Sequence, residues 1–132
     1  MEQDFLQLLR DAGLHVTKTR RMLLDVLAHD HGPHTVEQLF IDLQGSLDRV
    51  TIYRSLASFE KLGFVRRCDF GDGTARFELA MTHHHHVMCR VCHRVESVHE
   101  CVLDGFEDSI RKKGYTDITH TLEFFAICAR CQ

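Results

Sequence analysis

The sequence lacks tryptophan, has a single proline and contains no long hydrophobic run. No stretch approaches the roughly 18 apolar residues that a membrane-spanning helix needs, so we expect no membrane span. The first residues carry acidic rather than basic side chains, unlike a secretory signal, and we therefore expect a cytoplasmic protein. The sequence also lacks a large excess of positive or negative charge, because its net charge is only −3. This balance neither indicates nor excludes a nucleic-acid partner, which requires only a local basic face.

Motifs of zinc enzymes are absent as well. There is no His-Glu-x-x-His, and no His-x-Glu paired with Pro-Cys-x-x-Cys, so the general acid or base of those hydrolases and deaminases is missing. We therefore expect no enzyme. The sequence is instead rich in residues that can bind metals, with 11 histidines and 6 cysteines among 132 residues. In a cytoplasmic chain, paired cysteines indicate metal or redox chemistry rather than a disulfide framework.

The first part of the chain has the periodicity of four helices. Apolar residues recur with helical spacing in segments that begin near Phe5, Thr17, Thr35 and Arg49. Thr35 is followed three residues later by a glutamine, which is the spacing of a capping box. Gly63 stands where a glycine commonly ends a helix, so we expect the fourth helix to end just before it.

After the helices, the pattern changes to the alternation of strands. Residues 64–70 and 74–79 alternate around a Gly-Asp-Gly turn, which predicts a β-hairpin. Helices followed by a tight hairpin are the order of a winged helix-turn-helix. Beyond residue 81 we expect short strands at 84–90 and 94–98, a helix at about 103–113 and a strand at about 117–127. The predicted fold class is therefore α+β, with a winged helix-turn-helix domain over residues 1–81 and an α/β domain over residues 82–132.

Two Cys-x-x-Cys motifs give the clearest chemical signal. Cys89 and Cys92 form the first motif, and Cys128 and Cys131 form the second. Each motif can supply two thiolates, and together they complete the tetrahedral sulfur shell of a structural zinc site. Two redox motifs or incidental buried thiols are the alternatives, but neither motif lies in the βαβ pattern of a thioredoxin-like protein. We therefore expect a structural Zn²⁺ ion at these four cysteines.

Four consecutive histidines, residues 83–86, precede the first cysteine motif. The run is internal, unlike a purification tag, and a merely solvated stretch would lead poorly into a strand. In an extended chain, His84 and His86 face one way, and His83 and His85 face the other. This predicts two separate metal half-sites that each need partners from elsewhere, and imidazole suits zinc, iron, nickel and copper alike. The candidate partners are Glu78, Asp104 and His120, and further His31, His34, Cys68, Asp69 and Cys101.

Several stretches together make the sequence resemble the ferric uptake regulator family over nearly its whole length. They are the segments AGL, VTIYRSL, FEL, HHHHVMCRVC and HTLEFFAICARC. The resemblance implies a homodimer, held by the C-terminal domain, that binds an A/T-rich inverted repeat of double-stranded DNA when a regulatory divalent metal is bound. It also implies that the fourth helix enters the major groove, where an aromatic ring can pack on a thymine methyl group and an arginine can bind bases or phosphates. The residues that match DNA-binding positions are Arg20, Thr51, Tyr53 and Arg54.

The resemblance also implies ligand sets for the metals. The four motif cysteines match a structural zinc site. The regulatory set matches Glu78, His84 and His86, completed by a residue near the interdomain hinge, for which Cys68 and Asp69 are the candidates. The second set matches His83, His85, Asp104 and His120.

Departures from the family pattern bear on the identity of the sensed metal. Ser97 stands where iron- and peroxide-sensing relatives have an acid, and Pro33 stands where they have a hinge histidine. The unbroken histidine run and Cys101 look more like the zinc uptake branch, in which a thiol often joins the sensing site. We therefore expect a zinc-responsive repressor of metal uptake genes. An iron, manganese or nickel regulator and a peroxide sensor are the alternatives within the family, and a zinc store is the alternative outside it.

Overall fold

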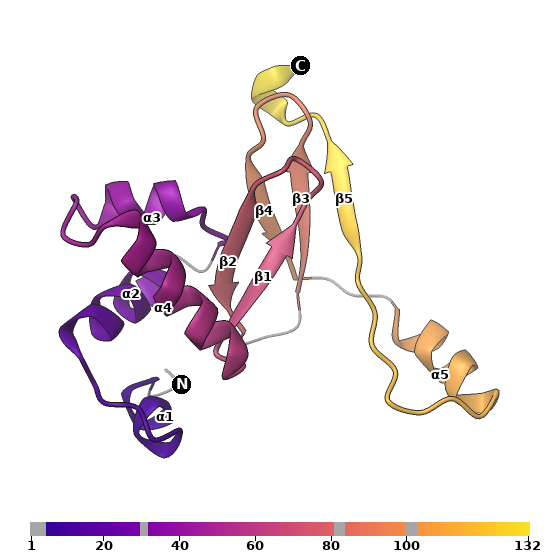
Figure 1. The fold of residues 1–132 in the computed structure, drawn as a ribbon. Coiled ribbons are helices and arrows are strands. Elements are labelled where there is room, and N and C mark those ends of the chain that lie inside the picture. The colour runs from indigo at the N-terminus through magenta and orange to yellow at the C-terminus, as the bar shows by residue number, and fades with distance from the viewer. Residues whose placement is uncertain (1–4, 30–31, 81–83, 100–102) are drawn as a thin grey trace. The chain divides into compact units, whose positions relative to one another are not determined.

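The computed structural model describes residues 5–29, 32–80, 84–99 and 103–132 (Figure 1). Contacts within the chain divide it into two compact units, Met1–Met81 and Thr82–Gln132. Within the described ranges, no helix has the length and apolar character needed to cross a membrane.

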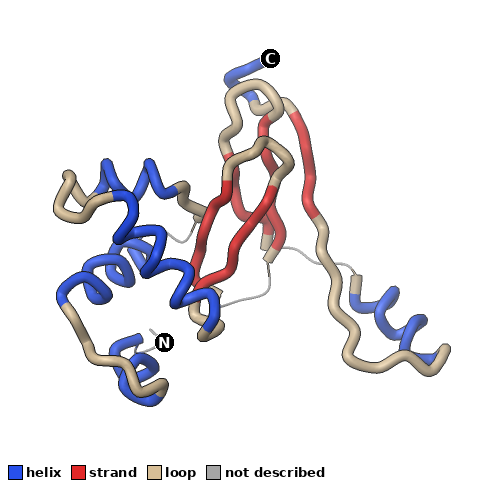
Figure 2. Tube along the Cα trace, viewed as in Figure 1, coloured by secondary structure: helices blue, strands red, loops and turns tan. Residues whose placement is uncertain are grey.

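The first unit begins with four helices (Figure 2). Their bounds are α1 Phe5–Asp11, α2 Lys18–His29, α3 Val36–Asp42 and α4 Arg49–Lys61. They form where the apolar spacing predicts them, because each can bury one stripe of side chains against the others. In α4 this stripe is Ile52, Leu56 and Phe59, all of which are fully buried in a core shared with α2 and α3.

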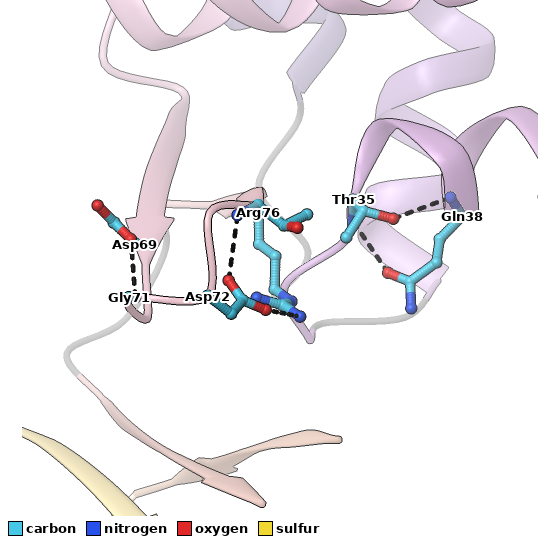
Figure 3. A network of polar contacts seen from close by, with 7 residues as sticks. Thr35, Gln38, Asp69, Gly71, Asp72 and Arg76 are labelled. Atoms are coloured by element: carbon cyan, nitrogen blue, oxygen red, sulfur yellow. Dashed lines mark hydrogen bonds and ion pairs between the residues drawn. The ribbon is translucent and has the colours of Figure 1, made fainter. Parts of the chain in front are cut away.

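Side chains at the helix ends satisfy backbone groups that have no partner within the helix. Thr35 Oγ1 accepts a hydrogen bond from Gln38 N at 3.0 Å, and Gln38 Oε1 accepts one from Thr35 N at 2.8 Å (Figure 3). This is the predicted capping box of α3. At the start of α4, Asp48 Oδ1 accepts from Thr51 N at 2.7 Å. Gly63 ends α4 with a φ of 82°, in the left-handed region that glycine adopts at little cost.

The hairpin of the first unit consists of β1 Val65–Asp69 and β2 Ala75–Leu79, which pair antiparallel. His34 adds a short third segment, because its backbone N–H and carbonyl exchange hydrogen bonds with Phe77 at 2.8 and 2.7 Å. β1 packs against α4, while β2 contacts α2 and α3. Four helices followed by a hairpin that packs on them confirm the predicted winged helix.

Polar side chains close the turn between the two strands of the wing. Asp69 Oδ1 accepts a hydrogen bond from Gly71 N at 2.8 Å, and Asp72 Oδ1 accepts one from Thr74 N at 3.2 Å. Asp72 also pairs with Arg76, four residues further on, at 2.8 Å (Figure 3). These contacts fix the turn that sets the register of the hairpin.

The described part of the second unit contains a three-stranded sheet and an α-helix of nine residues. Its elements are β3 His85–Cys89, β4 Val95–Val98, α5 Asp104–Lys112, β5 Glu123–Ala126 and a 3₁₀ turn at Ala129–Cys131. β3 lies in the middle, antiparallel to β4 and parallel to β5. Because a parallel pair needs a long crossover connection, α5 and the segment after it occupy the stretch between β4 and β5.

The strand predicted at about 117–127 is shorter in the structure, and the prediction of its start was wrong. β5 begins only at Glu123, where it first finds a partner in β3. Upstream, Asp117 has a φ of 53°, a backbone conformation that does not occur within a strand. The alternation of apolar and polar residues therefore extends further along the sequence than the pairing does.

Several large apolar side chains of the second unit remain exposed. The buried hydrophobic cluster among the described residues draws on the first unit. By contrast, α5, β5 and their flanks expose apolar groups with 40 to 66% of their surface open. We call these the exposed apolar set: Phe106, Ile110, Tyr115, Phe124, Phe125 and Ile127.

Candidate metal centres and DNA-binding surface

The four motif cysteines come together in the second unit. The Sγ atoms of Cys89, Cys92, Cys128 and Cys131 all lie within 4.8 Å of one another, and those of Cys92 and Cys128 are 3.8 Å apart. In a tetrahedral site with Zn–S bonds of about 2.3 Å, neighbouring sulfurs are about 3.8 Å apart. The cluster therefore fits a structural zinc ion in both ligand type and spacing.

The fold explains why two motifs so far apart in sequence meet. Cys89 ends β3 directly beside Ala126 of the parallel strand β5, so the residues that follow both strands emerge at the same edge. The backbone N–H groups of Cys92 and Cys128 point at Cys89 Sγ, at 3.5 and 3.4 Å. These contacts, that from Cys128 first, lower the pKa of Cys89 to about 5, whereas a hydrogen bond with Cys128 raises the pKa of Cys131 to about 12. A metal bound here must displace the proton of Cys131, so its binding releases protons.

The histidines that lead into β3 alternate as predicted. The rings of His84 and His86 lie together, with centroids 4.8 Å apart, and His99 lies 5.8 Å from His84. His85 instead faces His120, at 5.2 Å between centroids. Alternation along the strand thus separates two groups of imidazoles. His83, which we assigned to the second group, lies outside the described residues.

Glu107 joins the second group and was not among the ligands or partners predicted from the sequence. Its Oε1 lies 2.5 Å from His120 Nδ1, and both side chains are about four-fifths buried. A carboxylate accepts hydrogen bonds, so it favours the imidazole tautomer that donates from Nδ1 and keeps the Nε2 lone pair for a metal. Glu107 lies three residues after Asp104 on the same helix face, which is the signal that could have found it. Asp104 begins α5, and its side chain lies outside the described part of the chain.

On the wing, Cys68 and Glu78 lie together. Cys68 Sγ is 3.7 Å from Glu78 Oε1, and both residues are buried. Arg66 Nε pairs with the same carboxylate oxygen at 3.4 Å. Because strand residues alternate, these side chains lie on the opposite face of the hairpin from Phe77, which belongs to the helical core. Asp69 is exposed, and its carboxylate is bonded to the turn.

Two other candidates, His31 and Cys101, lie outside the described residues. His34 is buried and is tied through its backbone to β2, as described above.

The helix α4 presents the residues assigned to DNA. Its inward stripe is filled by apolar groups, while Tyr53 and Arg54 are exposed, Tyr53 with 44% of its surface open. Thr51 is half-buried in the first turn. Arg20 lies on α2, where its Nη1 donates to the carbonyl of His15 at 2.8 Å and so also holds the preceding turn. The structure thus leaves Tyr53 and Arg54 accessible on one helix.

Sequence reasoning also missed Arg67, whose side chain connects the wing to α4. Arg67 Nη2 donates a hydrogen bond to the hydroxyl of Tyr53 at 3.2 Å. Its Nε pairs with Glu60 at 3.3 Å, and its guanidinium lies 5.0 Å from the centre of the Phe77 ring. In the sequence, Arg67 is only one of two adjacent arginines on a strand, so nothing local distinguishes it.

Comparison with known proteins agrees with these features. The model of the ferric uptake regulator family matches residues 11–125. The ferric uptake regulation protein of Legionella pneumophila is 32% identical over 132 residues, covering 96% of this chain and 97% of that protein. The peroxide-responsive repressor PerR of Staphylococcus epidermidis is 27% identical over 128 residues, covering 94% and 85%.

The solved structures agree as well. The crystal structure of the Vibrio cholerae ferric uptake regulator superposes with a TM-score of 0.80 at 33% identity, covering 95% of this chain and 100% of that chain. Fold and sequence are thus shared over almost the whole length, and the predicted α+β class is confirmed. The chain belongs to the ferric uptake regulator family, whose members are metal-responsive, DNA-binding transcription regulators and not enzymes.

Proposed function

We propose that this protein is a zinc-responsive repressor of metal uptake genes. The observation that carries the choice of metal is the buried thiol of Cys68 beside the carboxylate of Glu78 on the wing. Thiolates are soft ligands that favour zinc, whereas iron(II) and manganese(II) are better served by imidazole and oxygen ligands. A regulatory site with Cys68 among its ligands therefore selects zinc.

The proposed regulatory site takes Cys68 and Glu78 from the first unit, and His84 and His86 from the second. These supply one sulfur, one oxygen and two nitrogens, a complete tetrahedral set for zinc. Because the ligands come from both units, bound zinc would restrict how the units are oriented. A metal that binds one orientation more tightly shifts the population toward it, and this links zinc to DNA binding.

Asp69 is the weaker candidate for the hinge ligand. Its carboxylate already accepts a hydrogen bond from Gly71 N at 2.8 Å, and adjacent strand residues point to opposite faces. Asp69 would have to leave the wing turn to join Glu78. We therefore assign the hinge position to Cys68.

Two further metal sites belong to the second unit. The four motif cysteines would hold a structural zinc ion, for which their spacing is suited. His85 and His120, with His83 and Asp104, form the proposed second site, and Glu107 would orient His120. Metal-binding histidines commonly donate their other ring N–H to such a carboxylate.

The exposed apolar set supports a homodimer. Monomeric proteins rarely expose large apolar surface, and such groups mark association surfaces. A second copy of the chain is the simplest partner, because a two-fold axis lets the same surface bury itself. A two-fold dimer also presents two copies of α4 to DNA, which matches the symmetry of an inverted repeat.

We assign DNA recognition to α4 in the major groove of an A/T-rich inverted repeat. Tyr53 would pack on thymine methyl groups, and Arg54 would bind bases or phosphates. Thr51 and Arg20 would contact the backbone at the start of α4 and of α2.

Fluorescence anisotropy of an A/T-rich inverted-repeat duplex tests this function. The 132-residue protein is titrated at buffered free zinc, iron(II) or manganese(II), and with a chelator that leaves the structural zinc in place. We expect tight binding with zinc only. Binding with iron or manganese but not zinc would favour the iron, manganese or peroxide-sensing alternatives, and no binding under any condition would favour a zinc store.

A further inference from the structure

Arg67 occupies a position that joins the two parts of the winged helix. It lies in the middle of β1, directly opposite Phe77 of β2. Its face of the hairpin is the one that packs on α4. The side chain is 37% exposed, so it reaches the boundary between the core and solvent.

Four side chains meet at this boundary, and we call them the wing–helix cluster: Tyr53, Glu60, Arg67 and Phe77. Arg67 donates to the Tyr53 hydroxyl at 3.2 Å and pairs with Glu60, seven residues further along α4, at 3.3 Å. The edge of the Tyr53 ring meets the Phe77 ring at 86°, with centroids 6.3 Å apart. The guanidinium lies 5.6 Å from the centre of the Tyr53 ring and 5.0 Å from that of Phe77.

Only an arginine can make these contacts together. The planar guanidinium has donors on three nitrogens, so Nε can pair with Glu60 while Nη2 donates to the tyrosine hydroxyl and the cation lies over the aromatic rings. A lysine ammonium carries the same charge but lacks the planar fork. The wing–helix cluster therefore depends on the shape of Arg67 and not only on its charge.

The cluster restrains the side chain proposed to read DNA. Tyr53 is held at its hydroxyl by Arg67 and at its ring edge by Phe77, yet 44% of its surface stays open. A side chain that is already fixed loses less conformational freedom when it binds. The ring is thus available to a ligand in one orientation.

We propose that Arg67 is a positioning residue for sequence recognition, which holds Tyr53 in the orientation that contacts a thymine methyl group. The wing and α4 then read DNA as one piece. This inference rests on the proposed role of Tyr53, and the experiment below separates the two.

The test measures preference for the thymine methyl group. Anisotropy titrations of the zinc-loaded protein compare an A/T-rich inverted-repeat duplex with the same duplex carrying deoxyuridine in place of thymine. The substitution removes the methyl groups and keeps the base pairs. Burying one methyl group corresponds to a preference of about fourfold for thymine.

Five single variants and one double variant, Tyr53→Ala with Arg67→Met, complete the design. Tyr53→Ala removes the ring, and Tyr53→Phe removes only the hydroxyl. Arg67→Met removes both the planar guanidinium and its charge, whereas Arg67→Lys removes the planar guanidinium and keeps a positive charge. Arg21→Met, at an exposed arginine of α2 outside the wing–helix cluster, is the control for loss of a positive charge.

We expect both Arg67 variants and Tyr53→Phe to reduce the thymine preference at least about twofold. In the Tyr53→Ala background, Arg67→Met should change the preference no further. Arg21→Met should weaken binding to both duplexes equally, if at all, and leave the preference intact. If Arg67→Met does not fold, Arg67→Lys decides the outcome.

Two results would overturn the inference. If the Arg67 variants weaken binding to both duplexes by the same factor, Arg67 acts as a phosphate contact and not through Tyr53. If Tyr53→Ala itself leaves the thymine preference unchanged, the proposed role of Tyr53 fails, and the inference falls with it.

Discussion

Cys92 is a single residue on which the second unit depends. Its sulfur lies 3.8 Å from that of Cys128, in the cluster that fits a zinc ion. Because the free energy of binding a structural zinc ion contributes directly to folding, we expect Cys92→Ser to lose this zinc and several kcal/mol of stability, out of the roughly 10 to 16 kcal/mol that such sites supply. Metal analysis and thermal unfolding check the result.

Cys68→Ser is the control for this variant, because it makes the same replacement at a cysteine that lies on the wing and outside the four-cysteine cluster. It should keep the structural zinc and lose only the zinc response of DNA binding. A Cys92→Ser protein that retains its full zinc content and unfolding temperature would rule out the four-cysteine site.

Glu107 offers a second prediction at the scale of one residue. Its carboxylate fixes His120, with which it shares a hydrogen bond of 2.5 Å. Removing such an outer carboxylate typically weakens metal binding by about 10- to 100-fold, so Glu107→Gln should lower the zinc affinity of the second site by that order. Competition titrations with a chromophoric chelator measure the affinity.

Asp108→Asn serves as the control, since Asp108 is the neighbouring acid of α5 and pairs with Arg111. It removes the same charge without touching His120. Equal losses of affinity in the two variants would show that the overall charge of α5, and not the orientation of His120, controls the site.

The sequence predicts residues well where the signal is local. The cysteine motifs and the alternating histidines are recognisable because their chemistry repeats within a few positions. Glu107 and Arg67 were missed because their partners are 13 and 14 residues away, outside the elements to which the two residues belong. Only the packing of α5 and of the wing brings those pairs together.

At the scale of elements, the start of α4 depends on Asp48. Its carboxylate accepts hydrogen bonds from the Thr51 side chain and backbone, and these hold the pKa of Asp48 below its usual value. A carboxyl whose pKa is lower in the folded state stabilises the protein above its unfolded pKa, and this contribution is lost as pH falls through the folded value. The cap of α4 should therefore weaken below about pH 4.

Urea unfolding of wild type, Asp48→Asn and Asp48→Ala at neutral and acidic pH measures this effect. Asparagine also caps helices but does not titrate, so the stability of Asp48→Asn relative to wild type should rise as the pH falls. Asp48→Ala should unfold at lower urea than both at neutral pH. A constant difference between wild type and Asp48→Asn across the pH range would contradict this role.

Among elements, the helices were predictable and the edge of the sheet was not. The capping box at Thr35 and the glycine at the end of α4 mark boundaries within a few residues of sequence. The start of β5 depends instead on where β3 offers backbone partners, which only the parallel pairing determines. Alternation alone therefore predicted a strand that was too long.

At the scale of the whole molecule, the exposed apolar set predicts self-association. Phe106 of α5 is 66% exposed. At a two-fold interface this side chain would be buried in both subunits, so a substitution would remove its contribution to the free energy of dimerisation twice. Each buried phenylalanine is worth about 1.5 to 3 kcal/mol, so Phe106→Glu should raise the dimer dissociation constant about a hundredfold or more. Analytical ultracentrifugation measures this constant.

Ile41→Glu is the comparison, because Ile41 is 63% exposed on α3 of the first unit. It introduces the same charge at an equally open apolar residue outside the exposed apolar set. We expect it to leave the dimer intact. A dimer that is unchanged by Phe106→Glu, or weakened equally by both variants, would place the interface elsewhere.

The central claim is that zinc at the regulatory site and DNA on α4 are energetically coupled. Such coupling is reciprocal: if zinc strengthens DNA binding by some factor, DNA must strengthen zinc binding by the same factor. The most direct measurement is the zinc affinity of the regulatory site, by competition with a chelator, with and without a saturating A/T-rich inverted-repeat duplex. The account predicts that DNA raises the zinc affinity by the same factor by which zinc raises the DNA affinity in the anisotropy titration. In His86→Ala, DNA should not raise the zinc affinity. A zinc affinity that is the same with and without DNA would contradict it.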